Sequence, residues 1–182
     1  NSDLGTWNCH DGTLTVNGTG GVFKPGTTDF TIDGNTADDT PHLVIANTAS
    51  AILSGDLVVG WGKQGVLTVE SGGVVNNKTA FLGNESGSTG VATVTGTGSQ
   101  WNNLINLSAG YPGTGTLNIT DGGQVNNTEG SLGHESGSTG EAMVTGSGSK
   151  WNNSSALHVG RDRPSPMKIF DGGVVANTVG YI

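Results

Sequence analysis

Positive charge is scarce in this chain: seven Lys and Arg stand against fifteen Asp and Glu, which gives a formal net charge of −8. Nucleic acids and anionic membranes both bind through clustered positive charge, so neither is expected as a partner. Cysteine is nearly absent as well, and the single Cys9 excludes an internal disulfide and a cysteine-rich metal site. The sequence also has no apolar run of membrane-spanning length.

Aromatic residues make up only 5% of the chain and charged residues 12%, whereas 33 of the 182 residues are Gly. The glycines follow no strict Gly-X-Y spacing, which excludes collagen. Gly, Ser, Thr, Asn and Val dominate, and these residues favour turns and strands over helices. Because Val, Leu and Ile recur at fixed places, the chain is not expected to be disordered. The predicted fold class is all-β.

An internal repeat organises the sequence. Residues 65–114 are written again at 115–164, at an offset of 50, and a third copy begins at Ser165 and stops at Ile182. The first two copies share whole segments: Gly72-Gly73 with Gly122-Gly123, Glu85–Gly90 with Glu135–Gly140, and Trp101–Asn103 with Trp151–Asn153. Self-similarity at a fixed period of this length predicts a stack of repeated structural units.

Each copy divides again into two equal units, which in the first copy are residues 65–89 and 90–114. A unit opens with a stretch that alternates apolar with small or polar residues, as in Gly65–Val69, and a Gly-rich turn and two further short strands follow. Three short strands and three turns predict one coil of a parallel β-helix, or solenoid. Roughly 25 residues per coil give about seven coils, the first two irregular, and a rod on the order of 30–35 Å long at the usual strand spacing.

The repeat also divides the chain into segments. Residues 1–64 are expected to form irregular N-terminal coils of the same β-helix, 65–114 and 115–164 two repeats of two coils each, and 165–182 a truncated third repeat. The sequence begins at Asn1 rather than Met and stops inside a repeat, so we expect it to be a piece of a longer protein.

Asparagine ends the second strand of every clear coil. Asn tolerates the left-handed backbone conformation, and its amide can both donate to and accept from an identical neighbour. Stacked coils would therefore align these residues into a structural ladder, which we favour over a ligand site. The ladder positions are Asn77, Asn103, Asn127, Asn153 and Asn177.

Trp101 and Trp151 occupy matching places in alternate coils, and Val75 and Val125 occupy the same place in the coils between them. Surface-aligned indole rings could grip carbohydrate by stacking. The exchange with valine instead indicates an inward position, so all four residues are predicted to lie in the core.

Carboxylates are the remaining candidates for chemistry, because a β-helical polysaccharide lyase or hydrolase needs clustered acids, or a bound calcium with a basic residue. Asp121 and Asp171 recur before Gly-Gly and are interpreted as turn residues. The four histidines share no metal-ligand spacing. No catalytic, metal or cofactor-binding residue is predicted. The surface residues considered for recognition are Asp38 and Asp39 in one loop, and Glu85 and Glu135 in two matching loops.

The repeats resemble a known family. The units Gly-Thr-Leu-Asn-Ile-Thr-Asp-Gly-Gly-Gln-Val-Asn-Asn (115–127) and Gly-Ser-Thr-Gly-Glu-Ala-Met-Val-Thr-Gly-Ser-Gly-Ser-Lys-Trp-Asn-Asn (137–153) are similar to passenger repeats of Gram-negative autotransporter adhesins. The resemblance covers Asp56–Ile182 well and the segment before Asp56 loosely. It implies a right-handed parallel β-helix, exported through type V secretion and displayed on the outer membrane. In that family, attachment to the membrane runs through a C-terminal translocator barrel, which these residues do not include.

The leading hypothesis is a non-enzymatic cell-surface adhesin or stalk that mediates adhesion, self-association or biofilm formation. Its expected partner is a host surface protein or glycan, or a second copy of the same passenger. The alternative is a β-helical module that binds or degrades polysaccharide, and a third possibility is a passive spacer. Recognition is expected from what varies between the copies, such as Lys78–Ala80 against Thr128–Gly130, or Tyr111 against Arg161.

Overall fold

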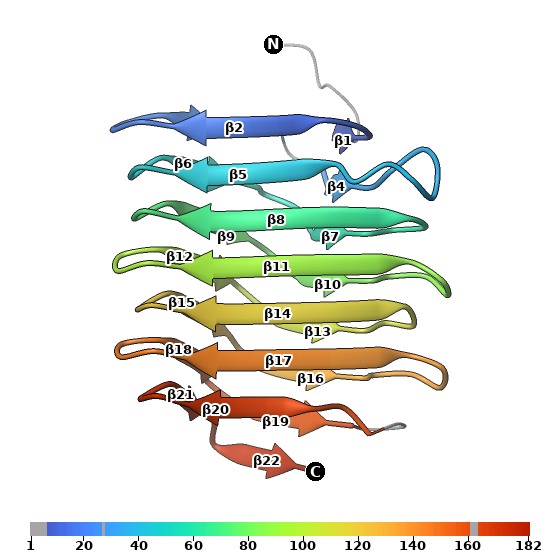
Figure 1. Cartoon of the computed structure of the whole chain (residues 1–182), viewed down its shortest axis with the longest axis vertical. Coiled ribbons are helices and arrows are strands. Elements are labelled where there is room, and N and C mark those ends of the chain that lie inside the picture. The colour runs from blue at the N-terminus through green and yellow to red at the C-terminus, as the bar shows by residue number, and fades with distance from the viewer. Residues whose placement is uncertain (1–6, 27, 161–163) are drawn as a thin grey trace.

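The computed structural model describes residues 7–26, 28–160 and 164–182, and within them the chain forms strands and turns without a helix. The strands run across the molecule and stack from one terminus to the other (Figure 1). Arg161, one of the variable positions noted above, lies outside the described residues. Within the described residues, no helix has the length and hydrophobicity needed to cross a bilayer.

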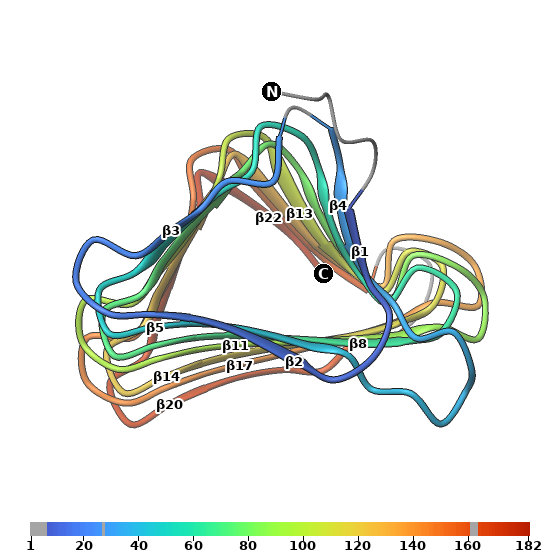
Figure 2. The same cartoon turned by 90° about the horizontal axis from the view of Figure 1, so that it is seen from above.

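Three parallel sheets form the three sides of a triangular prism when the molecule is seen along its axis (Figure 2). Sheet A consists of β1 (Trp7–Cys9), β4 (Phe30–Ile32), β7 (Leu57–Val59), β10 (Ala80–Leu82), β13 (Asn106–Ala109), β16 (Glu129–Leu132), β19 (Ala156–Val159) and β22 (Val179–Tyr181). Sheet B consists of β2 (Thr13–Asn17), β5 (His42–Ala46), β8 (Gln64–Glu70), β11 (Thr89–Thr95), β14 (Thr114–Thr120), β17 (Thr139–Thr145) and β20 (Met167–Phe170). Sheet C consists of β3 (Val22–Phe23), β6 (Ser50–Ile52), β9 (Val74–Asn77), β12 (Gln100–Asn103), β15 (Gln124–Asn127), β18 (Lys150–Asn153) and β21 (Val174–Ala176).

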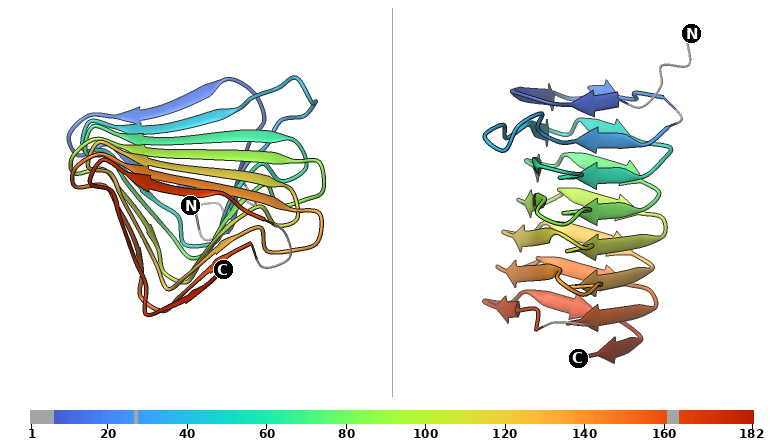
Figure 3. Two further views of the ribbon diagram at one scale, coloured as in Figure 1. Left: turned by 60° about the horizontal axis from the view of Figure 1, so that its bottom comes forward. Right: turned by 90° about the vertical axis from the view of Figure 1, so that its right-hand side faces the viewer.

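The chain visits sheets B, C and A in turn, so that three consecutive strands make one coil. Coil 1 runs from β2 to β4 and coil 7 from β20 to β22, and the coils lie as parallel layers (Figure 3). Seen from the N-terminal end, the chain turns clockwise as it recedes (Figure 2), which is the right-handed sense that parallel connections prefer. The prediction of a parallel β-solenoid with about seven coils of about 25 residues is confirmed.

Strand alternation builds the core. In β8 every second residue is buried, with Gly65, Leu67 and Val69 facing inward, and the strands above and below keep the same register. Leu67 and Val69 therefore belong to columns of Leu, Ile, Val and Ala that run through the prism. Stacking buries apolar side chains that a single coil would expose, so each coil depends on its neighbours for stability.

A second column explains why the repeat spans two coils. In sheet C, Val75 pairs with Trp101, which pairs with Val125, which pairs with Trp151. All four side chains have no exposed surface, as predicted for core residues. The residue that faces Trp151 from sheet A is small and makes room for the ring, because a Cβ on Gly130 would come within 2.8 Å of Cζ2 of Trp151. Large and small residues alternate so that each ring fits against the coil before it.

Turn residues also behave as their sequence suggests. Asp121 and Asp171 have φ of 53° and 49°, in the left-handed region that Asp enters at a turn. Gly90 must lack a side chain for a different reason. A Cβ there would overlap the carbonyl oxygen of Val59, because sheets A and B meet closely at this corner.

Candidate binding groove

Two successive asparagines end the second strand of four coils, and the pleat separates them. The second asparagine of each pair faces the core and the first faces outward. The outward side chains bond in series: Nδ2 of Asn102 donates to Oδ1 of Asn76 (3.1 Å), Nδ2 of Asn126 to Oδ1 of Asn102 (2.8 Å), and Nδ2 of Asn152 to Oδ1 of Asn126 (2.9 Å). We call these four residues the outer asparagine ladder. It was not anticipated from the sequence, although the repeated Asn-Asn pair carried the signal.

The inner asparagines, which were predicted to align into a ladder, are hydrogen-bonded in pairs. Nδ2 of Asn77 donates to Oδ1 of Asn103 (2.9 Å), and Nδ2 of Asn127 donates to Oδ1 of Asn153 (2.6 Å). Between the pairs, Nδ2 of Asn103 is directed at the backbone oxygen of Asn126 at 3.5 Å. Beyond the second pair, Nδ2 of Asn153 is directed at the backbone oxygen of Ala176 (3.4 Å). Asn177, in the last coil, is exposed.

Tryptophan sets this pairing. Nε1 of Trp101 donates to Oδ1 of Asn77 (2.7 Å), and Nε1 of Trp151 donates to Oδ1 of Asn127 (2.8 Å). The valine coils have no indole N–H to offer, so the bonded unit is one tryptophan with the asparagines of two coils. The stacking of Trp101 and Trp151 on carbohydrate, which the sequence left open, is excluded because both rings are fully buried.

An open groove of about 770 Å³ follows the corner where sheets C and A meet. The asparagines of both sets line it in four coils. The rest of its lining consists of Leu53, Ser54, Lys78, Leu104, Thr128 and Ser154. Leu104 is 76% exposed and is the most prominent apolar side chain of this lining, and Lys78 is its single charged residue. The groove is thus long, nearly neutral and periodic.

The outer ladder leaves hydrogen-bonding capacity unused. An asparagine side chain has two N–H donors and two accepting lone pairs. Asn102 and Asn126 each spend one donor and one acceptor within the ladder. The second donor and acceptor of each amide are left for water or a ligand, and they recur at the strand spacing of about 4.8 Å.

The acidic candidates lie elsewhere. Asp38 is exposed, and Oδ2 of Asp39 accepts a hydrogen bond from the backbone N–H of Thr36 (2.8 Å), so Asp39 closes its own loop. Glu85 and Glu135 occupy matching loops two coils apart, about 10 Å along the axis. None of these four residues lines the asparagine groove. The structure therefore does not bring the predicted recognition residues together into one carboxylate site.

The two glutamate loops are held by the same pair of hydrogen bonds. Oγ of Ser88 accepts from the backbone N–H of Glu85 (3.1 Å) and donates to its carbonyl oxygen (2.7 Å). Ser138 makes the same two bonds with Glu135, at 3.1 and 2.6 Å. Both serines are buried, so the loops are tied to the solenoid. The two serines hold the loops through local hydrogen bonds, which the sequence repeat did not reveal.

Neither metal geometry nor likeness to known proteins assigns a function. Within residues 7–26, 28–160 and 164–182, no three His, Cys, Asp or Glu side chains are grouped so that they could hold a metal ion. No family model, curated protein or solved structure matches the chain. Because one fold can carry many functions, function has to be inferred from the surface itself.

Proposed function

We propose that the chain is a segment of a non-enzymatic adhesive rod, displayed as an autotransporter passenger at the surface of a Gram-negative bacterium, and that it binds an extended neutral polysaccharide along the asparagine groove. The observation that carries this proposal is the outer asparagine ladder, with its hydrogen-bonded amides at one position of four successive coils. The resemblance of Asp56–Ile182 to passenger repeats supports the surface display.

The repeat distance of the groove favours a glycan over a peptide. The amides recur at about 4.8 Å, and the sugars of an extended β-linked glycan each advance by roughly 5 Å, whereas a peptide strand repeats its side-chain pattern only every ~6.8 Å. Sugar hydroxyls both donate and accept, which suits the remaining N–H and lone pair of each amide. An apolar side chain, Leu104, in the middle of the lining offers contact to the C–H face of a sugar.

The expected affinity of one rod is low. Four amides that each contribute a net ~0.5–1.5 kcal/mol barely offset the roughly 4 kcal/mol or more that association costs. A single fragment should therefore bind a glycan chain no more tightly than a dissociation constant of about 30 mM. Useful adhesion would come from longer rods and from many rods on one surface, because linked weak contacts gain affinity through effective concentration.

The test uses the fragment coupled at high density to beads and insoluble β-linked neutral polysaccharide as the probe. The double variant Asn102→Thr and Asn126→Thr removes two ladder amides while it keeps a residue that suits strands. Asn118→Thr is the matched control, since Asn118 faces outward on sheet B, away from the groove. We expect the double variant to lower retention at least fivefold and the control to leave it unchanged. Equal retention by all three proteins would contradict the proposal, and so would soluble sugar products released by the wild type.

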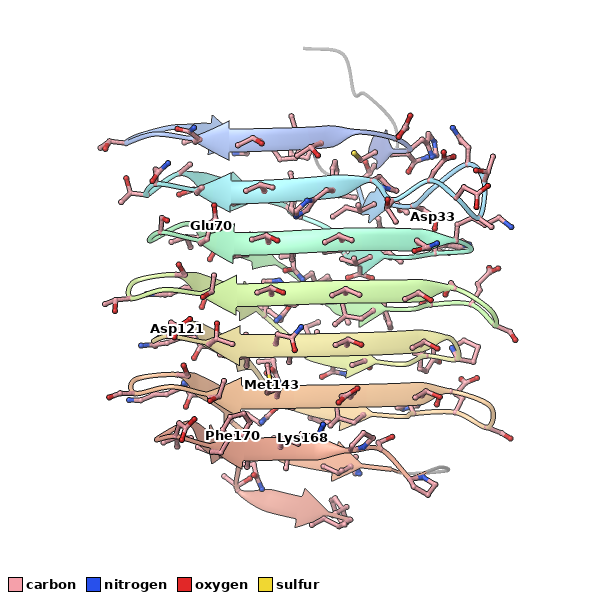
Figure 4. All side chains as sticks on the ribbon, viewed as in Figure 1. Asp33, Glu70, Asp121, Met143, Lys168 and Phe170 are labelled. Carbon is pink, nitrogen blue, oxygen red and sulfur yellow. The ribbon has the colours of Figure 1, made fainter. Side chains whose placement is uncertain are left out.

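A second candidate function, self-association, is favoured by the shape of sheet B. Its seven strands, up to seven residues long, give a face of roughly 700–800 Å², close to the area per partner of a standard interface. The outward side chains of β11 and β14 are uncharged, and Met143 and Phe170 add apolar surface nearby (Figure 4). Sedimentation velocity over a concentration series would detect such association, and Thr93→Arg should abolish it. A monomer at all concentrations would rule it out.

A further inference from the structure

Aromatic and histidine side chains gather on the outer face of sheet A and on the loops beside it. The ring centroids of Phe81 and Tyr111 lie 5.6 Å apart with an interplanar angle of 44°, and those of Tyr111 and His134 lie 4.7 Å apart at 59°. Further along the axis, His158 stacks on Tyr181 at 4.5 Å and 6°. These residues come from five successive coils. Tyr111 and His134 follow β13 and β16, where the chain leaves sheet A for sheet B and the loops project (Figure 2). None of the five residues lines the asparagine groove.

The fold does not require these residues. In the register of sheet A, Phe81 pairs with Ser108, Ser108 with Ser131, and Ser131 with His158, so that one outward column places two serines between two larger residues. The buried columns beside it keep apolar residues of similar kind in each copy. An outward column that changes from coil to coil is free to serve recognition, because packing does not fix it.

The two serines leave a hollow of about 70 Å³ between the larger side chains. Oγ of Ser131 donates to Oγ of Ser108 (3.0 Å), and each serine is only 7% exposed. The rest of the lining includes Asn106, Glu129, His134 and His158. The hollow exceeds the roughly 30 Å³ share of one water molecule, so it can receive a small polar substituent but not a whole sugar ring.

The ring of Tyr111 is held in place from the next coil. The carboxylate of Glu135 lies near its hydroxyl, and hydrogen bonding with Glu135 together with its negative charge raises the pKa of Tyr111 above its ordinary value. A tethered ring loses less conformational freedom when a ligand stacks on it. Glu135, considered from the sequence as a recognition residue, is thus in a position to orient the aromatic platform.

An aromatic residue and a glutamate also recur in this arrangement. Trp61 and Glu85 hold the places of Tyr111 and Glu135 one repeat earlier in the sequence, and Trp61 is 46% exposed. The two aromatic side chains are two coils apart, about 10 Å along the axis. That separation corresponds to about two sugar units, which places two stacking positions on one edge of the rod.

We propose that this aromatic edge, formed by Phe81, Tyr111 and His134 beside the hollow at Ser108 and Ser131, is a separate binding site for a pyranose sugar. The C–H face of the sugar stacks on the rings, which offer large contact area with little entropy to lose. One small polar substituent enters the hollow, where serine hydroxyls, an amide and a carboxylate satisfy its donors and acceptors. The carboxylate of Glu129 in the lining disfavours phosphate and other anions. This site is independent of the asparagine groove.

The test follows the aromatic NMR signals of the chain as monosaccharide methyl glycosides are titrated, with glucoside, galactoside and N-acetylglucosaminide as the sugar probes and inorganic phosphate as the anion control. We expect at least one sugar to shift the ring signals of Tyr111, His134 and His158 together, and phosphate to shift none of them. The variants Tyr111→Ala and Ser131→Leu, which remove the platform and fill the hollow, should each weaken this binding at least fivefold. Phe170→Ala, an exposed aromatic residue on sheet B, is the matched control and should leave it unchanged.

The groove variant Asn102→Thr with Asn126→Thr separates the two sites. It should retain sugar binding at the aromatic edge even if polysaccharide retention is lost, and loss of both in this variant would contradict the independence of the two sites. Circular dichroism checks that Ser131→Leu folds, and Tyr111→Ala tests the platform without filling a buried space. The proposal is overturned if no sugar shifts the ring signals at the highest concentration tested, or if the shifts survive both edge variants.

Discussion

Replacement of Asn127 by alanine tests the central bonding unit of the rod. Asn127 is 5% exposed, its Oδ1 accepts the indole N–H of Trp151 (2.8 Å), and its Nδ2 donates to Asn153 (2.6 Å). Alanine leaves the indole N–H in the core without an acceptor, at a cost of about 1–3 kcal/mol for one stranded polar group. The lost bond to Asn153 adds about 1 kcal/mol. We expect the free energy of unfolding to fall by about 2–4 kcal/mol.

Asn103→Ala is the matched control. Asn103 occupies the register-equivalent position with the same 5% exposure, but the next coil carries valine and sends it no indole N–H. Its removal deprives Nδ2 of Asn77 of one acceptor, and that group still reaches the carbonyl oxygen of Thr79 at 2.9 Å. The cost should be less than half that of Asn127→Ala. Urea denaturation followed by far-UV circular dichroism measures both, and unchanged m-values would show that the unfolding transition is comparable.

A double-mutant cycle isolates the bond between indole and amide. Trp151→Phe removes the N–H but keeps an aromatic ring, so Asn127→Ala should cost less in that background than in the wild type. A coupling energy of about 1–2 kcal/mol is expected, within the range of residues in direct contact. Additivity within about 0.5 kcal/mol, or equal costs for Asn103→Ala and Asn127→Ala, would refute the role assigned to tryptophan.

Two further predictions concern the frame of the solenoid. Gly90→Ala should lower the melting temperature sharply, because its Cβ would meet backbone that cannot give way. Gly62→Ala is the control and should change the melting temperature little, since the nearest atom of a non-adjacent residue would be 3.9 Å from its Cβ. Similar melting temperatures for the two variants would contradict the prediction for Gly90. Burial lowers the pKa of His42 below its ordinary 6.5, against the smaller raising effect of Glu70. The unfolded chain therefore binds a proton more readily, and the stability contributed by neutral His42 is lost as pH falls through 6.5. His42→Gln should flatten this part of the pH–stability curve, and an unchanged slope would count against it.

The sequence predicts the architecture because the residues that build it repeat. Alternation in segments such as Gly65–Val69 places strands, and the observed strand Gln64–Glu70 extends that range by one residue at each end. The first third is less regular, and there β6 spans only Ser50–Ile52. Leu53 turns inward at the corner, where it is 4% exposed, and the strand ends before it.

The sites were harder to predict, because they depend on which way a side chain points and on contacts between coils. The sequence shows Asn102-Asn103 as a pair, but only the pleat decides that Asn102 faces the groove and Asn103 the core. The discontinuity of the inner ladder depends on the reach of Trp151 into the preceding coil, which no spacing in the sequence encodes. The hollow likewise joins Ser108 and Ser131 from separate coils, and neither serine belongs to a recognisable motif.

The bonded unit of two coils implies that the rod can change length only in steps of one whole repeat. Deletion of residues 115–139 removes one coil and joins the Trp101 coil to the Trp151 coil. Deletion of residues 90–139 removes two coils and joins the Val75 coil to the Trp151 coil. If coils were interchangeable, the longer deletion would cost more stability, because stability in a stack is a sum over coils and their interfaces.

The contacts in the core predict the reverse order. In the wild type Gly130 makes room for the ring of Trp151, but after the shorter deletion Leu107 takes that place. Such overpacking costs about 1–3 kcal/mol or more. A defective interface also divides the stack into two short pieces, which support each other poorly. After the longer deletion Trp151 lies against Asn77, which accepts the indole N–H of Trp101 in the wild type, and against Ala80, which holds the place of Gly130 one repeat earlier. The protein that loses two coils should therefore melt at a higher temperature than the protein that loses one, and the opposite order would show that the coils, rather than their pairs, are the units of stability.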